Sequence, residues 1–245
     1  MKPLTHMAAR PLTLFLSLVC VASVSVDAQE KSKAKDTPNP AFAEVEDVAG
    51  VSRILLIGDS ISIGYTVPVR EALKGKVNVH RPKANCGPTS TALKSIDAWL
   101  GDGKWDVIHF NWGLHDLKYM GPNGENLGDP GDPKNHQQVP PDEYEKNLQQ
   151  LVERLRMTGA KLIWRNTTPV PAGASGRVVG DSQKYNTVAA KVMKQHGIEV
   201  HDLCSFVVAR QDQIMLPADV HFTKEGYDAL AQEVAAVILK AVEKE

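Results

Sequence analysis

The stretch RILLIGDSIS, residues 53–62, joins a strand to a turn and the start of a helix. Arg53–Ile57 is a nearly continuous apolar run, which is typical of a strand covered on both faces. Gly58, Asp59 and Ser60 follow at once, and this order predicts a tight turn with Ser60 at the beginning of a helix. A strand that passes directly into a helix in this way indicates a parallel sheet.

The same alternation continues along the chain. Apolar runs that predict further strands are Val77–His80, Trp105–Phe110, Lys161–Arg165 and Ile198–Asp202. Helical spacing of apolar residues is found in Ser90–Leu100, Glu143–Met157, Lys184–His196 and Thr223–Val242. This pattern predicts an α/β fold, a three-layer α/β/α sandwich whose five parallel strands have the flavodoxin-like order 2-1-3-4-5. In such a sheet, ligands bind at the carboxyl ends of the strands.

The amino-terminal residues differ in composition from the rest. Lys2 and Arg10 precede an apolar stretch, and small residues at 26 and 28 complete the pattern of a cleavable signal peptide over residues 1–28. A retained signal anchor is the alternative. Residues 29–48 are polar and predict a linker, which leaves residues 49–245 as the domain. The expected location is therefore secreted or periplasmic, with no stable membrane insertion once the signal is removed.

Composition excludes several classes of protein. The 245 residues are 42% hydrophobic and 23% charged, with a formal net charge of −1 and no long basic tract. A general nucleic-acid binder is not expected from such a balance. Three cysteines cannot form a disulfide scaffold. Cys86 and Cys204 follow strands at opposite edges of the predicted sheet, so we expect them to be unpaired.

Residues that could take part in catalysis lie after three of the predicted strands and just before the last predicted helix. Ser60 is either a nucleophile or a helix cap. Gly87 is either a backbone N–H donor to an oxyanion or part of a Gly-Pro turn. The pair Asp219 and His221 suits a general base with its orienting carboxylate, although such a pair also occurs in surface turns. A fourth segment, residues 111–116 (NWGLHD), includes Trp112, which either stacks on a sugar ring or packs under the loop.

Together these segments resemble the SGNH (GDSL-type) hydrolase family over residues 53–242. That family has a flavodoxin-like sandwich with a Ser in G-D-S after the first strand, a Gly after the second, an Asn in G-x-N-D after the third and a late His in D-x-x-H. The resemblance implies that Ser60 is the nucleophile and His221 the base. It also implies that the backbone N–H groups of Ser60 and Gly87 stabilise the oxyanion.

This sequence departs from the family pattern at two positions. It reads GLHD at 113–116, so His115 replaces the usual Asn and is the candidate third oxyanion donor, with Asn111 as a substitute donor. The acid near the carboxyl end is Asp219, two residues before His221 rather than three. Either Asp219 orients the imidazole through an altered turn, or a backbone carbonyl does so.

The predicted function is a secreted serine esterase that hydrolyses O-acyl, chiefly O-acetyl, esters on carbohydrates through a covalent acyl-enzyme. Its partner is a small-molecule or polysaccharide ester, and no cofactor or metal is implied. The alternatives are a lipid esterase or thioesterase and a non-catalytic glycan-binding relative. The loop Tyr119–Asp142, rich in Gly, Pro, Asn and Asp, is expected either to border the pocket with Arg177 or to form a mobile insert.

Overall fold

The structure of the protein is a computed structural model that describes residues 38–243. The predicted signal peptide, residues 1–28, and the first part of the predicted linker lie outside the described residues. All the described residues belong to one compact unit, which begins at Pro38.

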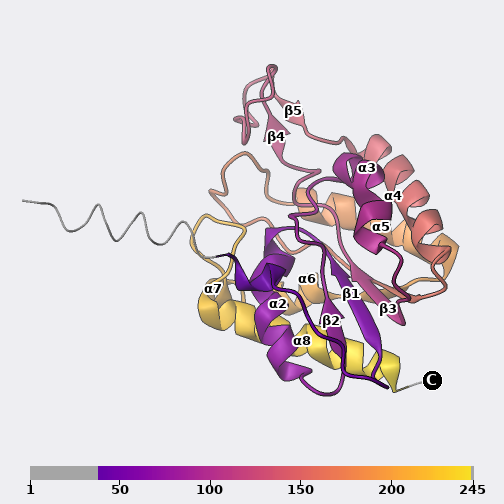
Figure 1. Cartoon of the computed structure of the whole chain (residues 1–245). Helices are drawn as coiled ribbons and strands as arrows, with labels where there is room; N and C mark the ends of the chain where they lie inside the picture. Colours follow the sequence, from indigo (N-terminus) through magenta and orange to yellow (C-terminus); the bar gives the residue numbers. More distant parts are fainter. Residues whose placement is uncertain (1–37, 244–245) are drawn as a thin grey trace, which may run out of the picture. The chain divides into compact units, whose positions relative to one another are not determined.

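The centre of the domain is a sheet of five parallel strands (Figure 1). Its strands are β1 (Arg53–Ile57), β2 (Asn78–His80), β3 (Val107–Phe110), β6 (Lys161–Arg165) and β7 (Glu199–His201). Their order is β2-β1-β3-β6-β7, which confirms the predicted order 2-1-3-4-5 because β4 and β5 belong to a separate hairpin. The four residues of β3 and four of the five in β1 are buried, as expected for strands that are covered on both sides.

Helices cover both faces of this sheet and complete the predicted three-layer sandwich (Figure 1). On one face lie α2 (Ser60–Ala72) and α8 (Lys224–Val242), which pack against each other. On the other lie α3 (Thr89–Leu100), α4 (Pro141–Arg156) and α5 (Asp181–His196). Two short helices, α6 (Leu203–Val208) and α7 (Gln211–Ile214), connect β7 to the loop before α8, and the sequence analysis did not anticipate them.

Residues 38–48, which the sequence assigns to the linker, contact the domain. The short helix η1 (Pro40–Phe42) buries Ala41, and the backbone of Val48 exchanges hydrogen bonds of 2.9 and 3.0 Å with the side-chain amide of Asn78. The contacts involve polar groups more than apolar burial, so the composition of the segment does not reveal them.

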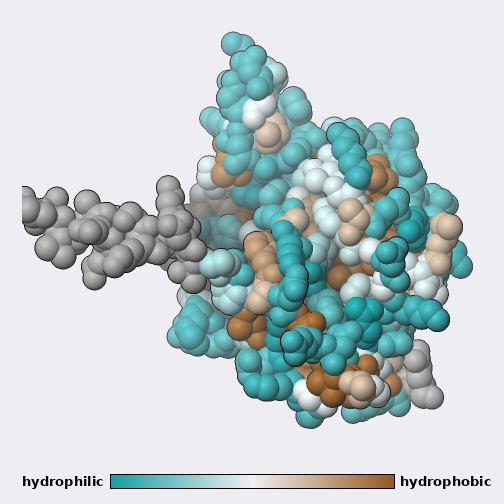
Figure 2. Space-filling model, viewed as in Figure 1, coloured by the Kyte–Doolittle hydropathy of each residue, from teal (hydrophilic) through white to brown (hydrophobic). Residues whose placement is uncertain are grey.

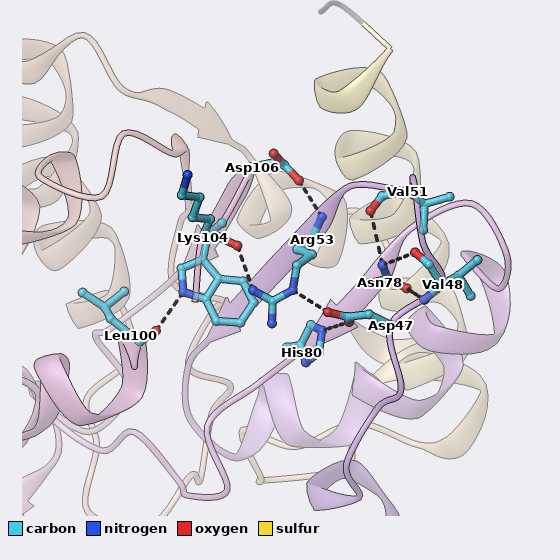
Figure 3. A network of polar contacts seen from close by, with 10 residues as sticks. Asp47, Val48, Val51, Arg53, Asn78, His80, Leu100, Lys104 and Asp106 are labelled. Carbon is cyan, nitrogen blue, oxygen red and sulfur yellow. Dashed lines mark hydrogen bonds and ion pairs between the residues drawn. The ribbon is translucent and has the colours of Figure 1, made fainter. Parts of the chain in front are cut away.

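A polar network fixes this segment at the amino-terminal end of the sheet (Figure 3). Asp47 accepts from Arg53 Nε at 2.7 Å, and its other oxygen lies 2.6 Å from His80 Nε2. Arg53 in turn donates its backbone N–H to Asp106 at 2.7 Å, and its guanidinium lies 4.4 Å from the ring centre of Trp105. The segment does not cover the opposite, carboxyl-terminal end of the sheet, where the loops that follow the strands lie.

The loop after β3 forms a projection from the domain (Figure 1). The short strands β4 (Tyr119–Met120) and β5 (His136–Gln137) pair antiparallel at its base, and its surface is largely hydrophilic (Figure 2). Within residues 38–243, no helix has both the length and the apolar character needed to cross a membrane.

Candidate active site

Three side chains that the sequence singled out meet at the carboxyl-terminal end of the sheet. The Oγ of Ser60 lies 2.9 Å from Nε2 of His221, although 161 positions separate the two residues. Nδ1 of the same imidazole lies 2.7 Å from Oδ1 of Asp219. The hydroxyl, ring and carboxylate therefore form a continuous chain, as a nucleophile, its general base and an orienting acid require.

The turn after β1 positions Ser60. Asp59 caps α2 by accepting the backbone N–H of Ile61 at 3.0 Å, so Ser60 becomes the first residue of the helix. Because the first N–H groups of a helix have no intrahelical acceptor, the N–H of Ser60 is available to a ligand. Gly58 allows the close approach of this turn, since a Cβ there would lie only 3.0 Å from the Ser62 side chain.

A tight loop before α8 positions the acid and the base. Ala218 has a left-handed backbone, φ +53°, which is uncommon for a residue other than glycine. Leu216 then accepts the backbone N–H of Asp219 at 3.3 Å and donates its own to the carbonyl of His221 at 3.0 Å. This altered turn brings the Asp219 carboxylate to the imidazole. The same carboxylate accepts the backbone N–H of His221 at 3.1 Å.

The ionisation of this pair favours a charged Asp219. Burial raises the pKa of the Asp219 carboxyl, but the hydrogen bonds from the ring and backbone of His221 outweigh it and lower the pKa below its ordinary value. A carboxylate beside Nδ1 keeps the proton on that nitrogen, which leaves Nε2 free to accept the proton of Ser60.

These groups line a cavity of about 360 Å³. His115 lines it as well, so the structure brings together the two histidines that the sequence proposed for the site. Burial lowers the pKa of His115, which keeps its ring neutral near pH 7 with one N–H to donate.

Gly87 does not belong to the lining of this cavity, whereas Asn85 does. The N–H of Gly87 donates to Oδ1 of Asn85 at 3.1 Å, and Gly87 has φ +55°, in the region that favours glycine. The backbone donor that the sequence proposed is therefore already occupied. Asn85, to which the sequence analysis assigned no role, lines the cavity instead.

Buried polar side chains hold these loops together. Arg81 donates to Ser62 Oγ at 3.0 Å and to the carbonyl of Ala84 at 3.1 Å, which ties the start of α2 to the loop that carries Asn85. Asp116 accepts the N–H and hydroxyl of Thr89 at 2.8 and 2.6 Å, which ties α3 to the loop after β3. Complete burial raises the pKa of Asp116 to about 7.

Two proposed substrate-binding residues lie outside the cavity. Asn111 is buried, and its amide nitrogen donates to the carbonyl of Arg165 at 2.7 Å, so it is not available as an oxyanion donor. Trp112 is 1% exposed and packs against Phe110, so it does not stack on a sugar. The structure therefore shows the packing alternative for Trp112 and does not offer Asn111 as a substitute donor, because the first residues after β3 remain buried in the core.

Residues from two further loops also line the cavity. Lys118, Asn126 and Leu127 come from the loop after β3, and Ser175 and Arg177 come from the segment between β6 and α5. The expectation that the long loop borders the pocket with Arg177 is therefore confirmed. Among the described residues, no group of three His, Cys, Asp or Glu side chains is arranged to hold a metal ion, and Cys86 and Cys204 are both free.

Comparison with known proteins agrees with this geometry. The model of the GDSL-like lipase/acylhydrolase family matches residues 56–229. The chain belongs to this family. The suspected resemblance and the prediction of an enzyme that hydrolyses carboxylic esters are confirmed at the level of the family. No curated protein sequence matches the chain.

Solved structures share the fold of this GDSL-family protein at low sequence identity. A lipase/acylhydrolase from Enterococcus faecalis is 18% identical with a TM-score of 0.63, and the match covers 78% of this chain and 96% of that one. The acetyl xylan esterase AlAXEase is 15% identical with a TM-score of 0.60, covering 76% and 99% of the two chains. A catalytic mutant of Axe2, an acetylxylan esterase from Geobacillus stearothermophilus, is 14% identical with a TM-score of 0.61, covering 80% and 96%.

Proposed function

We propose that this GDSL-family enzyme is a secreted serine esterase that removes O-acetyl groups from carbohydrates. The observation that carries the proposal is the hydrogen-bonded chain from Ser60 Oγ through the His221 ring to Asp219. Nine of the thirteen residues that line the cavity are polar or charged, and none is aromatic apart from the two histidines, which suits a carbohydrate better than a long acyl chain. Two structural neighbours are acetyl xylan esterases, which agrees with the proposal.

The reaction begins with proton transfer from Ser60 Oγ to Nε2 of His221 while the oxygen attacks the ester carbonyl. The Ser60 N–H and the side chains of Asn85 and His115 donate to the resulting oxyanion. Collapse of this intermediate breaks the bond to the sugar oxygen, which takes the proton from His221 and leaves. Asp219 stabilises the imidazolium throughout this half-reaction.

Water completes the cycle. His221 removes a proton from a water molecule, which attacks the acyl carbon and forms a second oxyanion. The bond to Ser60 Oγ then breaks, Ser60 regains its proton from His221, and the carboxylic acid departs. All steps use groups that line the cavity, and none requires a cofactor.

Hydrolysis of p-nitrophenyl acetate and release of acetate from acetylated xylooligosaccharides test the activity. The wild type should hydrolyse both, Ser60→Ala should lose both activities, and Ser205→Ala, which alters an exposed serine on α6, should retain them. Retained activity in Ser60→Ala would exclude the proposed mechanism. Higher activity on p-nitrophenyl palmitate would favour a lipid esterase, and glycan binding without any turnover would favour the non-catalytic alternative.

Export is tested separately. Cleavage after residue 28 should give a protein that begins at Gln29 in the periplasm or the medium. Amino-terminal sequencing of the exported protein measures this directly. Recovery of the intact amino terminus in a membrane fraction would favour the retained signal anchor.

A further inference from the structure

Two cationic side chains line the cavity beside the Ser60–His221 pair. Lys118 is only 8% exposed, and its Nζ donates to Oδ1 of Asn126 at 2.7 Å. Arg177 is half-buried, and its Nε and Nη1 donate to the carbonyls of Leu114 and Ser175 at 3.2 and 3.3 Å. Neutral protein oxygens thus hold both cations in place, on two different loops.

Neither cation has a carboxylate partner. Across residues 38–243, no Asp or Glu oxygen lies within 4.0 Å of Lys118 Nζ or the Arg177 guanidinium. Buried Lys and Arg side chains are normally paired, because an unpaired charge away from water is costly. Burial lowers the pKa of both groups, although the charge of Asp116 opposes this shift at Lys118 and the charges of Asp59 and Asp219 oppose it at Arg177.

The hydrogen bonds of the nearby acids go to groups other than Lys118 and Arg177. Asp219 lines the cavity, but its Oδ1 is hydrogen-bonded to the ring and backbone of His221. Asp59 is 2% exposed and caps α2, and the buried Asp116 accepts from Thr89; neither lines the cavity. Besides its two histidines, the lining contains two cations and one carboxylate. The cavity therefore favours an anionic ligand.

We propose that Lys118 and Arg177 form a subsite for a carboxylate on the substrate, which makes the substrate an O-acetylated acidic carbohydrate. The inference rests on the proposed function, because an acetyl group is neutral and the charge must then lie on the alcohol part of the ester. Arg177 presents a planar guanidinium, two of whose nitrogens already donate to the backbone, so it is fixed in orientation before the ligand arrives. Lys118 adds a second charge from the opposite loop.

The test compares two esters within each protein variant. Acetylated oligogalacturonides have a carboxylate on each sugar, whereas acetylated xylooligosaccharides are neutral. The wild type should show a kcat/KM about tenfold or more higher on the acidic ester, since hydrogen bonds to charged groups contribute strongly. Increasing salt should reduce this preference. Equal kcat/KM values on the two esters would overturn the proposal.

Substitutions assign the preference to the subsite. Arg177→Gln and Lys118→Gln should each reduce the ratio of acidic to neutral kcat/KM, and Arg177→Lys should retain part of it. Because the ratio is taken within one variant, a general loss of activity cancels. Arg210→Gln removes an exposed arginine that does not line the cavity and should leave the ratio unchanged. An unchanged ratio in both subsite variants would contradict the proposal.

Binding separates this inference from the catalytic proposal. In calorimetry, Ser60→Ala should bind deacetylated trigalacturonate more tightly than xylotriose, and Arg177→Gln in the same background should reduce the difference. If the wild type hydrolyses no ester but this difference is present, the proposed function fails and the carboxylate subsite stands. If esters are hydrolysed but trigalacturonate and xylotriose bind equally, the subsite fails and the esterase stands.

Discussion

Oδ1 of Asp219 lies 2.7 Å from Nδ1 of His221, although a single residue separates them. The left-handed backbone of Ala218 makes this short separation workable, because it turns the chain just before the acid. The carboxylate then reaches both the ring and the backbone N–H of the base. The candidate acid that the sequence indicates, at position −2 from the histidine rather than at the −3 of the family pattern, thus lies within hydrogen-bonding distance of the ring.

Asp219→Asn should therefore lower kcat strongly with little change in KM. An amide in this place offers its N–H₂ to Nδ1 and favours the wrong imidazole tautomer, which reduces catalysis by about 10²–10⁴-fold in such triads. Steady-state kinetics with p-nitrophenyl acetate measure the effect. Asp212→Asn, an exposed acid on α7, is the control. A kcat within twofold of the wild type in Asp219→Asn would mean that another group orients the imidazole.

His115 should be replaceable by asparagine better than by alanine. The ring is neutral near pH 7 because burial lowers its pKa, so one N–H can donate to the oxyanion, and an amide can do the same. His115→Ala should lower kcat by about 10²–10³-fold, the usual effect of losing one oxyanion donor, and His115→Asn by much less. Equal losses in kcat for the two variants would exclude a donor role for the ring.

Asn85 offers a second test of the oxyanion site. Its Oδ1 is fixed by the N–H of Gly87, which leaves its N–H₂ to donate into the cavity. Asn85→Ala should therefore lower kcat, and Asn85→Asp should lower it further because a carboxylate repels the oxyanion. A higher kcat in Asn85→Ala would instead assign the donor role to the Gly87 N–H that Asn85 now covers.

The sequence predicts the frame of this molecule well. Arg53–Ile57 and Lys161–Arg165 are strands with the predicted bounds, because a buried strand between turn residues leaves a clear apolar run. The strand order was also correct, because the number and alternation of elements restrict an α/β sheet to few arrangements. Ser60 was identified because its motif follows a strand end, and His221 because it stands beside an acid just before the last helix.

The walls of the cavity were harder to predict. Asn111 and Trp112 follow a strand end, as Ser60 does, yet their side chains turn into the core, and strand-end position alone does not give that direction. Asn85 and Lys118 reach the cavity through contacts between loops that lie far apart in the chain. Such tertiary contacts leave no periodic signal in the sequence.

Close packing between α2 and α8 should make Gly64 intolerant of a side chain. A Cβ at this position would collide with the Tyr227 ring. Gly64→Ala should lower the free energy of unfolding, because overpacking costs about 1–3 kcal/mol and outweighs the gain in helix propensity of about 1 kcal/mol. Urea unfolding measures this, with Lys94→Ala on the exposed side of α3 as control. In the double variant with Tyr227→Ala, the cost of Gly64→Ala should disappear; its persistence would exclude this collision as the cause.

The buried pair of His109 and His201 should make stability depend on pH. His201 Nδ1 lies 3.0 Å from His109 Nε2, and burial, together with the nearby Arg165, lowers the pKa of His201 to about 4 despite the opposing charge of Asp202.

Above pH 6.5 both rings are neutral in the folded and in the unfolded protein, so burying them costs no deprotonation and the free energy of unfolding is at its full value there. As the pH falls from 6.5 towards 4, the unfolded chain takes up a proton at His201 that the folded protein does not, and the free energy of unfolding decreases by up to about 3 kcal/mol. His201→Asn should reduce this slope in urea unfolding measured across that range, and the buried His109, whose pKa burial also lowers, accounts for the slope that remains. The exposed His136→Asn should not reduce the slope, and an unchanged slope in His201→Asn would show that other groups cause the acid sensitivity.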